Sequence, residues 1–267
     1  MTPPALPLAH RIAGAGPPVV LLNGGMMTYA SWEPVAASLG SRFTVLGCDF
    51  RGQLLSPGPA PADLAGHAAD VAALLDHVGW GSAHVVATSF GAEVALELAA
   101  TAPERVRSLI AITAMDRATP EFVRGTAEMR NALAAVLAGG ERGRFYDVLV
   151  AGVYSPEYRR AEAAALAARR AQVDQLPLAW FAGVDALLAA IDGFDLGARL
   201  PGVQCPSLVV IAAADEVIAP ERSHALAAAL AAEEATHPTA GHALVTEDPA
   251  WIAGVCLDFL ERQERRS

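Results

Sequence analysis

The chain has 267 residues, which is enough for one α/β domain with an insertion or for two small domains. Its hydrophobic content of 53% can supply a sizeable core, and its net charge of −10 comes without the clustered basic residues that nucleic-acid binding requires. No apolar run approaches the roughly 18 residues that a membrane span needs, and no signal-peptide pattern is evident. We therefore expect a soluble, cytoplasmic protein with neither a nucleic-acid nor a membrane partner.

Three cysteines, Cys48, Cys205 and Cys256, lie in or beside apolar runs and lack the spacing of metal ligands. An odd number of cysteines in apolar surroundings favours buried free thiols in a reducing compartment. The sequence also contains no cluster of metal ligands and no phosphate-cradling glycine loop. We expect neither a metal nor a cofactor.

Strand and helix patterns alternate along the first part of the chain. Strands are predicted at residues 19–22, 43–48, 84–87 and 108–113. Helices are predicted at residues 31–39, 64–78 and from 92 onward, where apolar residues recur at near-helical spacing. This alternation predicts an α/β fold with a mostly parallel sheet and helices on both faces.

The alternation stops between Met115 and Leu200, where only helical patterns occur. Four helices are predicted in this stretch, and Ser155-Pro156 provides a cap and a first-turn proline for the third of them. The prediction is a core of residues 1–115 and 201–267 with an all-helical insertion at 116–200. Six aromatic residues of the insertion can either line a pocket or pack between helices: Phe122, Phe145, Tyr146, Tyr154, Trp180 and Phe181.

Residues 85–92, Val-Val-Ala-Thr-Ser-Phe-Gly-Ala, place a serine between a short apolar run and a helix-forming segment. This pattern predicts a strand, a very tight turn and a helix, with the hydroxyl group of Ser89 projecting from the apex. A serine nucleophile needs this exposure and the backbone N–H that follows it. Ala87 occupies the first glycine position of the G-x-S-x-G pattern, and an ordinary serine N-cap would give a similar sequence. The pentad alone therefore leaves both interpretations open.

Two later segments offer partners for this serine. A continuous apolar run, typical of a strand buried on both faces, ends on Asp215, and His242 lies in a loop after another short strand-like run. The order Ser89, Asp215, His242 matches one known chain order of nucleophile, acid and base. Asp116 also follows a predicted strand and is a second candidate for the acid.

On these residues the chain resembles the α/β-hydrolase fold superfamily over almost its full length. Residues 19–27 resemble that family's strand and oxyanion loop, with Asn23 in place of the usual histidine. Residues 49–56 resemble its D-x-R-G-x-G-x-S loop, with Leu54 in place of the second glycine. The resemblance implies that residues 116–200 form a lid inserted after the sixth strand of the fold.

The resemblance also implies a serine hydrolase that acts through an acyl-enzyme. Ser89 would be the nucleophile, His242 the base and Asp215 the residue that orients it, and the backbone N–H groups of Gly25 and Phe90 would form the oxyanion hole. We expect a small-molecule substrate, namely a carboxylic ester, lactone or thioester with a small-to-medium hydrophobic acyl group.

Met26, Trp180 and Phe181 are the residues that we expect to bind this substrate. Two other functions use the same residues. The first is acyl transfer, in which an alcohol replaces water; the Asn-Gly-Gly-Met segment at 23–26 also resembles a hydrolase-fold acyltransferase. The second is a small-molecule binding protein with negligible turnover.

Overall fold

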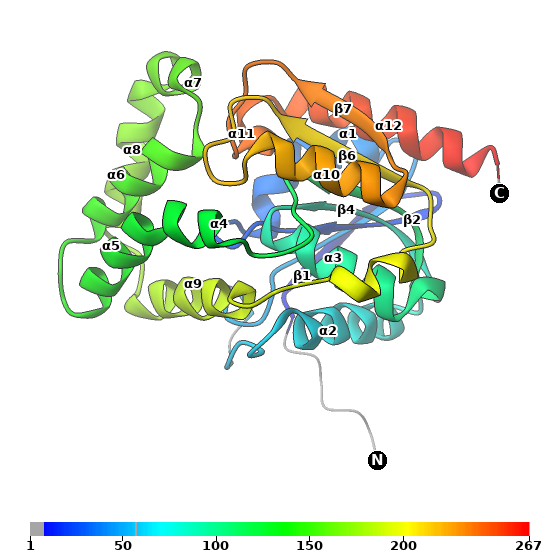
Figure 1. Cartoon of the computed structure of the whole chain (residues 1–267), viewed down its shortest axis with the longest axis horizontal. Helices are drawn as coiled ribbons and strands as arrows, with labels where there is room; N and C mark the ends of the chain where they lie inside the picture. The colour runs from blue at the N-terminus through cyan, green and yellow to red at the C-terminus, as the bar shows by residue number, and fades with distance from the viewer. Residues whose placement is uncertain (1–7, 57, 267) are drawn as a thin grey trace.

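Seven strands form one sheet in the computed structural model, which describes residues 8–56 and 58–266 (Figure 1). In chain order the strands are β1 (His10–Gly14), β2 (Pro18–Leu22), β3 (Thr44–Cys48), β4 (Ala83–Thr88), β5 (Val106–Ile112), β6 (Ser207–Ala212) and β7 (Glu233–His237). Their spatial order is β1-β3-β2-β4-β5-β6-β7, with β1 antiparallel to β3 and every other pair parallel. The predicted mostly parallel sheet is thus confirmed.

The central strands are mostly apolar and almost entirely buried, because both of their faces are covered by helices. In β2, Val20 and Leu22 belong to one core cluster, and Val19 and Leu21 belong to another on the opposite face. This division follows from the alternation of side chains along a strand. Helices α2 (Leu64–His77), α3 (Phe90–Thr101) and α10 (Pro220–Leu230) pack on the first face, and α1 (Glu33–Leu39) and α12 (Pro249–Glu264) on the second.

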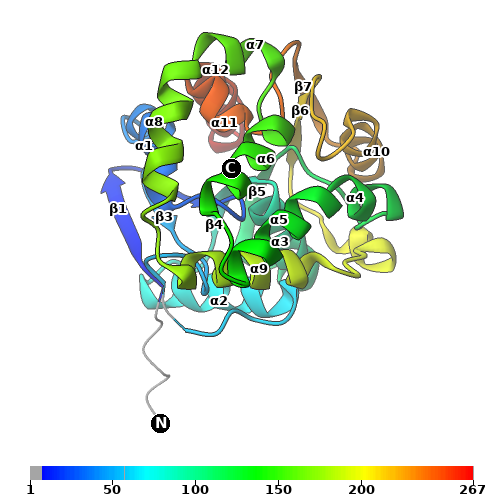
Figure 2. The same cartoon turned by 90° about the vertical axis from the view of Figure 1, so that its left-hand side faces the viewer.

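The helical segment lies between β5 and β6 and stands to one side of the sheet, at the left of Figure 1 and facing the viewer in Figure 2. Its helices are α4 (Pro120–Gly125), α5 (Ala127–Leu137), α6 (Arg142–Val153), α7 (Pro156–Ala161), α8 (Ala163–Val173) and α9 (Leu178–Ile191). Among the described residues it follows the fifth strand along the chain, where the resemblance implied the sixth. The boundaries predicted at 116 and 200 stay a prediction.

The segment has six helices where four were expected. Residues 122–136, whose apolar spacing suits a single helix, form the two helices α4 and α5, which meet at Thr126. The predicted cap of the third helix is present, since the Ser155 hydroxyl oxygen accepts a hydrogen bond from Tyr158 N–H.

The remaining elements are short. They are the 3-10 helices η1 (Tyr29–Trp32), η2 (Pro103–Arg105) and η3 (Gly197–Gly202), and the α-helix α11 (Leu244–Glu247). Throughout residues 8–56 and 58–266, no single helix is long and apolar enough to cross a membrane; α8 and α9 would reach that length and composition only as a pair, bent by 106°.

Candidate active site

Ser89 occupies a strained turn between β4 and α3. Its backbone has φ 52° and ψ −128°, a conformation that L-residues other than glycine rarely adopt, and its N–H donates to the carbonyl oxygen of Ile112 over 3.0 Å. Gly91 permits the turn, because a Cβ there would lie 2.6 Å from the carbonyl oxygen of Leu22 and 2.5 Å from that of Asn23. The methyl group of Ala87 is fully buried in β4, so alanine is accommodated at this position.

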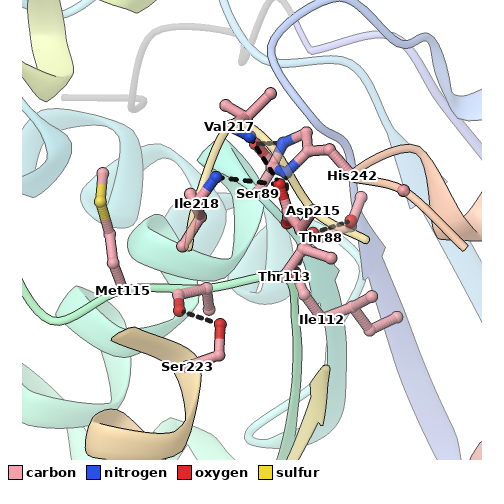
Figure 3. Close-up of polar contacts among 12 residues, drawn as sticks. Thr88, Ser89, Ile112, Thr113, Met115, Asp215, Val217, Ile218, Ser223 and His242 are labelled. Atoms are coloured by element: carbon pink, nitrogen blue, oxygen red, sulfur yellow. Dashed lines mark hydrogen bonds and ion pairs between the residues drawn. The ribbon is translucent and has the colours of Figure 1, made fainter. Parts of the chain in front are cut away.

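Asp215 and His242 meet Ser89 from two other loops. His242 Nδ1 lies 2.8 Å from Asp215 Oδ2, and His242 Nε2 lies 2.9 Å from Ser89 Oγ (Figure 3). The other carboxylate oxygen of Asp215 accepts hydrogen bonds from the N–H groups of Val217 and Ile218, over 2.8 and 2.9 Å. The structure therefore brings together the three side chains that the sequence singled out.

The carboxylate determines the direction of these hydrogen bonds. An ionised Asp215 can only accept, so Nδ1 of His242 carries the proton and donates it. In the neutral imidazole Nε2 is then an acceptor, and the Ser89 hydroxyl group donates to it. Asp215 and His242 are only 7% and 9% exposed, so little water competes for these contacts.

Asp116, the second candidate for the acid, is engaged elsewhere. One of its oxygens accepts from Arg117 over 2.9 Å and the other accepts from Arg222 over 2.5 Å. The carboxylate that contacts His242 belongs to Asp215.

Gly25 and Phe90, the expected oxyanion residues, both line the cavity that contains Ser89. A Cβ on Gly25 would lie 3.8 Å from the Cβ of Phe90, so the two backbones are close neighbours. Gln53 holds this loop in place, since its Nε2 donates to the carbonyl oxygens of Gly24 and Gly25 over 3.0 and 3.4 Å.

Asn23 takes part in the same support. Its Nδ2 donates to the backbone oxygen of Cys48 over 2.8 Å and to Asp49 Oδ1 over 3.1 Å, and the whole side chain is buried. The residue that replaces histidine therefore links the loop that carries Gly25 to the loop after β3. Sequence reasoning did not foresee this network, in which Gln53 also takes part.

A cavity of about 910 Å³ lies between the sheet and the helical segment, with Ser89 and His242 in its wall. Met26 and Trp180, two of the three residues expected to bind substrate, line it. Phe181, the third of these residues, is absent from the lining and fully buried. It packs edge-on against Phe145 and Trp180, with ring centroids 5.8 and 4.9 Å apart.

Two buried titratable residues beside the site were missed. Burial raises the pKa of Glu93 to about 8, and the negative charge of Asp215 adds to the shift; its Oε1 accepts from the backbone N–H of Met115. Burial lowers the pKa of His67 to about 4, and its ring packs edge-on against Phe90 with a centroid distance of 5.0 Å. Both side chains sit on apolar helix faces, so their helical spacing predicts burial but not their protonation state.

The three cysteines are free thiols, and burial raises the pKa of Cys48 and Cys256 to about 12. Across residues 8–56 and 58–266, no group of three or more His, Cys, Asp or Glu side chains is placed to hold a metal ion.

The fold and the arrangement at the end of β4 are those of the alpha/beta hydrolase fold, and the model of that family matches residues 17–249. The chain therefore belongs to the alpha/beta hydrolase fold family.

The relatives agree with this membership. RutD of Azorhizobium caulinodans, which carries carbamate hydrolase in its name, is 33% identical over 218 residues, or 80% of this chain and 78% of that protein. MGS-M2, an alpha/beta hydrolase enzyme from a Medee basin deep-sea metagenome library, superposes with a TM-score of 0.89 at 22% identity over 95% of this chain and 94% of its own. The enol-lactonase of Burkholderia xenovorans LB400 superposes with a TM-score of 0.82 at 25% identity, over 95% of this chain and 96% of its own.

Proposed function

We propose that the protein is a serine hydrolase that cleaves a carboxylic ester, lactone or thioester through an acyl-enzyme. The observation that carries the proposal is the continuous line of hydrogen bonds from Asp215 through His242 to Ser89, at the wall of a cavity large enough for a small molecule.

The geometry supports a two-step reaction. Ser89 Oγ attacks the carbonyl carbon while His242 Nε2 takes the hydroxyl proton, and Asp215 stabilises the resulting imidazolium. The oxyanion of the tetrahedral intermediate accepts hydrogen bonds from the backbone N–H groups of Phe90 and Gly25. As the intermediate collapses, the leaving oxygen or sulfur takes the proton from His242. Water, activated by the same imidazole, then hydrolyses the acyl-enzyme and releases the carboxylic acid.

The lining of the cavity supports an apolar acyl group of small to medium size. Met26, Phe122 and Trp180 are among the apolar side chains around it, and 910 Å³ falls within the usual range for small-molecule sites. Two similar proteins have names that refer to hydrolysis at an acyl carbon, the carbamate hydrolase and the enol-lactonase described above. These names support cleavage of a bond to an acyl carbon. The identity of the leaving group has to be determined by experiment.

A fluorophosphonate probe tests the nucleophile directly, because it forms a covalent bond with an activated serine. We expect the wild-type protein to be labelled and the Ser89→Ala variant to remain unlabelled, while a control variant at a serine away from the site, Ser38→Ala, labels as the wild type does. Equal labelling of Ser89→Ala and wild type would exclude Ser89 as the nucleophile.

Steady-state hydrolysis of p-nitrophenyl esters of increasing chain length tests turnover and measures the size of the acyl site. Acyl transfer would show itself as an ester product formed when a small alcohol is added. Labelling by the probe without any turnover would instead favour the binding-protein alternative.

A further inference from the structure

Arg169 is a cation in the cavity wall without an ionic partner. It lies on α8, and none of the described carboxylates forms an ion pair with it. The neighbouring Arg170, by contrast, is neutralised by ion pairs. Its guanidinium lies 2.9 Å from Glu141, 2.8 Å from Asp147 and 3.7 Å from Asp174. Arg169 therefore keeps a charge at the cavity wall that none of the described carboxylates neutralises.

Tyrosine hydroxyl groups surround this guanidinium in place of carboxylates. Arg169 Nη1 lies 3.5 Å from the Tyr154 hydroxyl oxygen, and the rings of Tyr154 and Tyr158 stack with centroids 5.0 Å apart. Tyr146 completes the group; its side chain is 7% exposed and lines the cavity, and its buried hydroxyl group has no hydrogen-bond partner in the described part of the chain. Burial lowers the pKa of Arg169, but these three tyrosines raise it by more, so the side chain remains a cation.

The cluster lies next to the reacting groups. Tyr154 follows Val153, whose carbonyl oxygen accepts a hydrogen bond from the N–H of Ala243 over 2.9 Å, and Ala243 follows His242. Arg169, Tyr154, Tyr146 and His242 all line the same cavity. An anionic group held by Arg169 would therefore share the cavity with an acyl group at Ser89.

We propose that Arg169, with the hydroxyl groups of Tyr146 and Tyr154, binds a carboxylate on the substrate, so that the preferred substrates are esters, lactones or thioesters that also carry a free acid group. This inference rests on the proposed function, since it names the substrate class for the same site.

A carboxylate fits this cluster for three reasons. A guanidinium presents paired N–H donors that match the two oxygens of a carboxylate, and tyrosine hydroxyl groups can donate to either oxygen. Within the cluster there is one cation for one negative charge. The other acidic residues of the lining are Glu128, Asp147 and Glu216, and Asp147 is already paired with Arg170, so Arg169 remains available to a ligand.

Two p-nitrophenyl esters with six-carbon acyl chains test the proposal by steady-state kinetics: the monoester of adipic acid, which carries a free carboxylate, and the hexanoate ester, which does not. We expect wild-type kcat/KM to favour the adipate ester, and Arg169→Met to reduce the adipate-to-hexanoate ratio by about 10- to 100-fold, mainly through KM. Tyr146→Phe, which removes one hydroxyl group, should reduce it less. Arg160→Met removes an exposed charge from α7 and should leave the ratio unchanged.

Calorimetry with adipate on a Ser89→Ala background tests binding without any turnover. We expect adipate to bind at least about 10-fold more weakly when Arg169→Met is added, and the neutral diamide of adipic acid to bind weakly to both proteins. Equal adipate binding with and without Arg169, or an unchanged kinetic ratio, would overturn the anion site and leave the hydrolase proposal intact. Absence of turnover on both esters, with adipate binding still dependent on Arg169, would count against the hydrolase proposal alone.

Discussion

The carboxylate of Glu247 accepts two hydrogen bonds from Ser155, one from its backbone N–H and one from its hydroxyl group, each over 2.7 Å. The same carboxylate accepts from the N–H of Gly241 over 3.1 Å. Gly241 immediately precedes His242, and Ser155 lies in the helical segment between α6 and α7. Glu247 therefore ties the loop that carries the imidazole to the helices above it.

Glu247→Ala should weaken activity without touching a reacting atom. The loss of three hydrogen bonds frees the His242 loop, and small misplacements of a reacting group reduce rate strongly. We expect kcat to fall by about 10- to 100-fold and the melting temperature to drop by several degrees, as measured by ester hydrolysis and thermal denaturation. Glu157→Ala, at an exposed glutamate of α7, is the control. If kcat stays at the wild-type value, the loop does not depend on Glu247.

Asp215→Asn and Asp116→Asn distinguish the two candidates for the acid. An amide at position 215 can donate to His242 Nδ1 and so favours the wrong tautomer, and we expect kcat to fall by several orders of magnitude. Asp116→Asn weakens two ion pairs with arginines and should change kcat by no more than a few-fold. The measurement is kcat for a p-nitrophenyl ester; the reverse ranking of the two variants would reassign the acid to Asp116.

Glu93 makes stability depend on pH, because its folded pKa of about 8 lies above its ordinary value of 4.5. Between these two values the unfolded chain ionises the carboxyl group while the folded protein keeps it protonated. The folded state then binds more protons, so the free energy of unfolding decreases as pH rises through this interval. Below 4.5 both states are protonated and the group contributes no pH dependence.

Glu93→Gln removes this titration while keeping an oxygen that can accept from Met115 N–H. We expect the variant to gain stability relative to wild type progressively as pH rises from 4.5 to about 8, and the gain to level off above that. Urea denaturation over this pH range measures the difference. Glu104→Gln, at an exposed carboxylate, should show a constant difference; a constant difference for Glu93→Gln as well would contradict the raised pKa.

Gly183 lets α9 touch the loop after β3. A Cβ at this position would lie 1.8 Å from the carbonyl oxygen of Gly52, so alanine forces the helix to move. We expect Gly183→Ala to lower the free energy of unfolding by about 1–3 kcal/mol, the usual effect of overpacking, as measured by urea denaturation.

Gly254→Ala in α12 is the matched control, because a Cβ there meets nothing within 4 Å. It should instead stabilise the protein by up to about 1 kcal/mol, since alanine is the better helix former. Similar effects of the two substitutions would show that the contact between Gly183 and Gly52 is not tight.

The central strands were predictable because burial on both faces gives each a continuous apolar run, residues 208–212 in β6 and 85–87 in β4. Both of these strands are buried throughout. Strand β1 was missed for the opposite reason. All five residues of His10–Gly14 are exposed at the edge of the sheet, so no hydrophobic pattern marks them. Its place in the sheet depends on pairing with β3, which is a long-range contact.

Parts of the candidate site were predictable for a topological reason. Ser89 and Asp215 follow parallel strands, and the carboxyl ends of parallel strands meet at one edge of a sheet. No such rule places residues of the helical segment. Phe181 was assigned to the pocket, and Arg169 was overlooked, because each depends on how one helix is rotated against its neighbours. That rotation follows from packing in three dimensions and has no signature in the spacing of residues.

The contact at Gly91 has a consequence for how this protein can adapt to its substrates. Because α3 packs directly against the carbonyl groups of Leu22 and Asn23, the turn that holds Ser89 and the segment leading to Gly25 leave no room between them for movement toward each other. A substrate of a different shape must then be accommodated by the helical segment α4–α9, whose helices can shift or re-pack while the spacing between the Ser89 turn and the Gly25 loop is kept. Selection for a new substrate would thus be expected to alter α4–α9 first and to spare the sheet beneath.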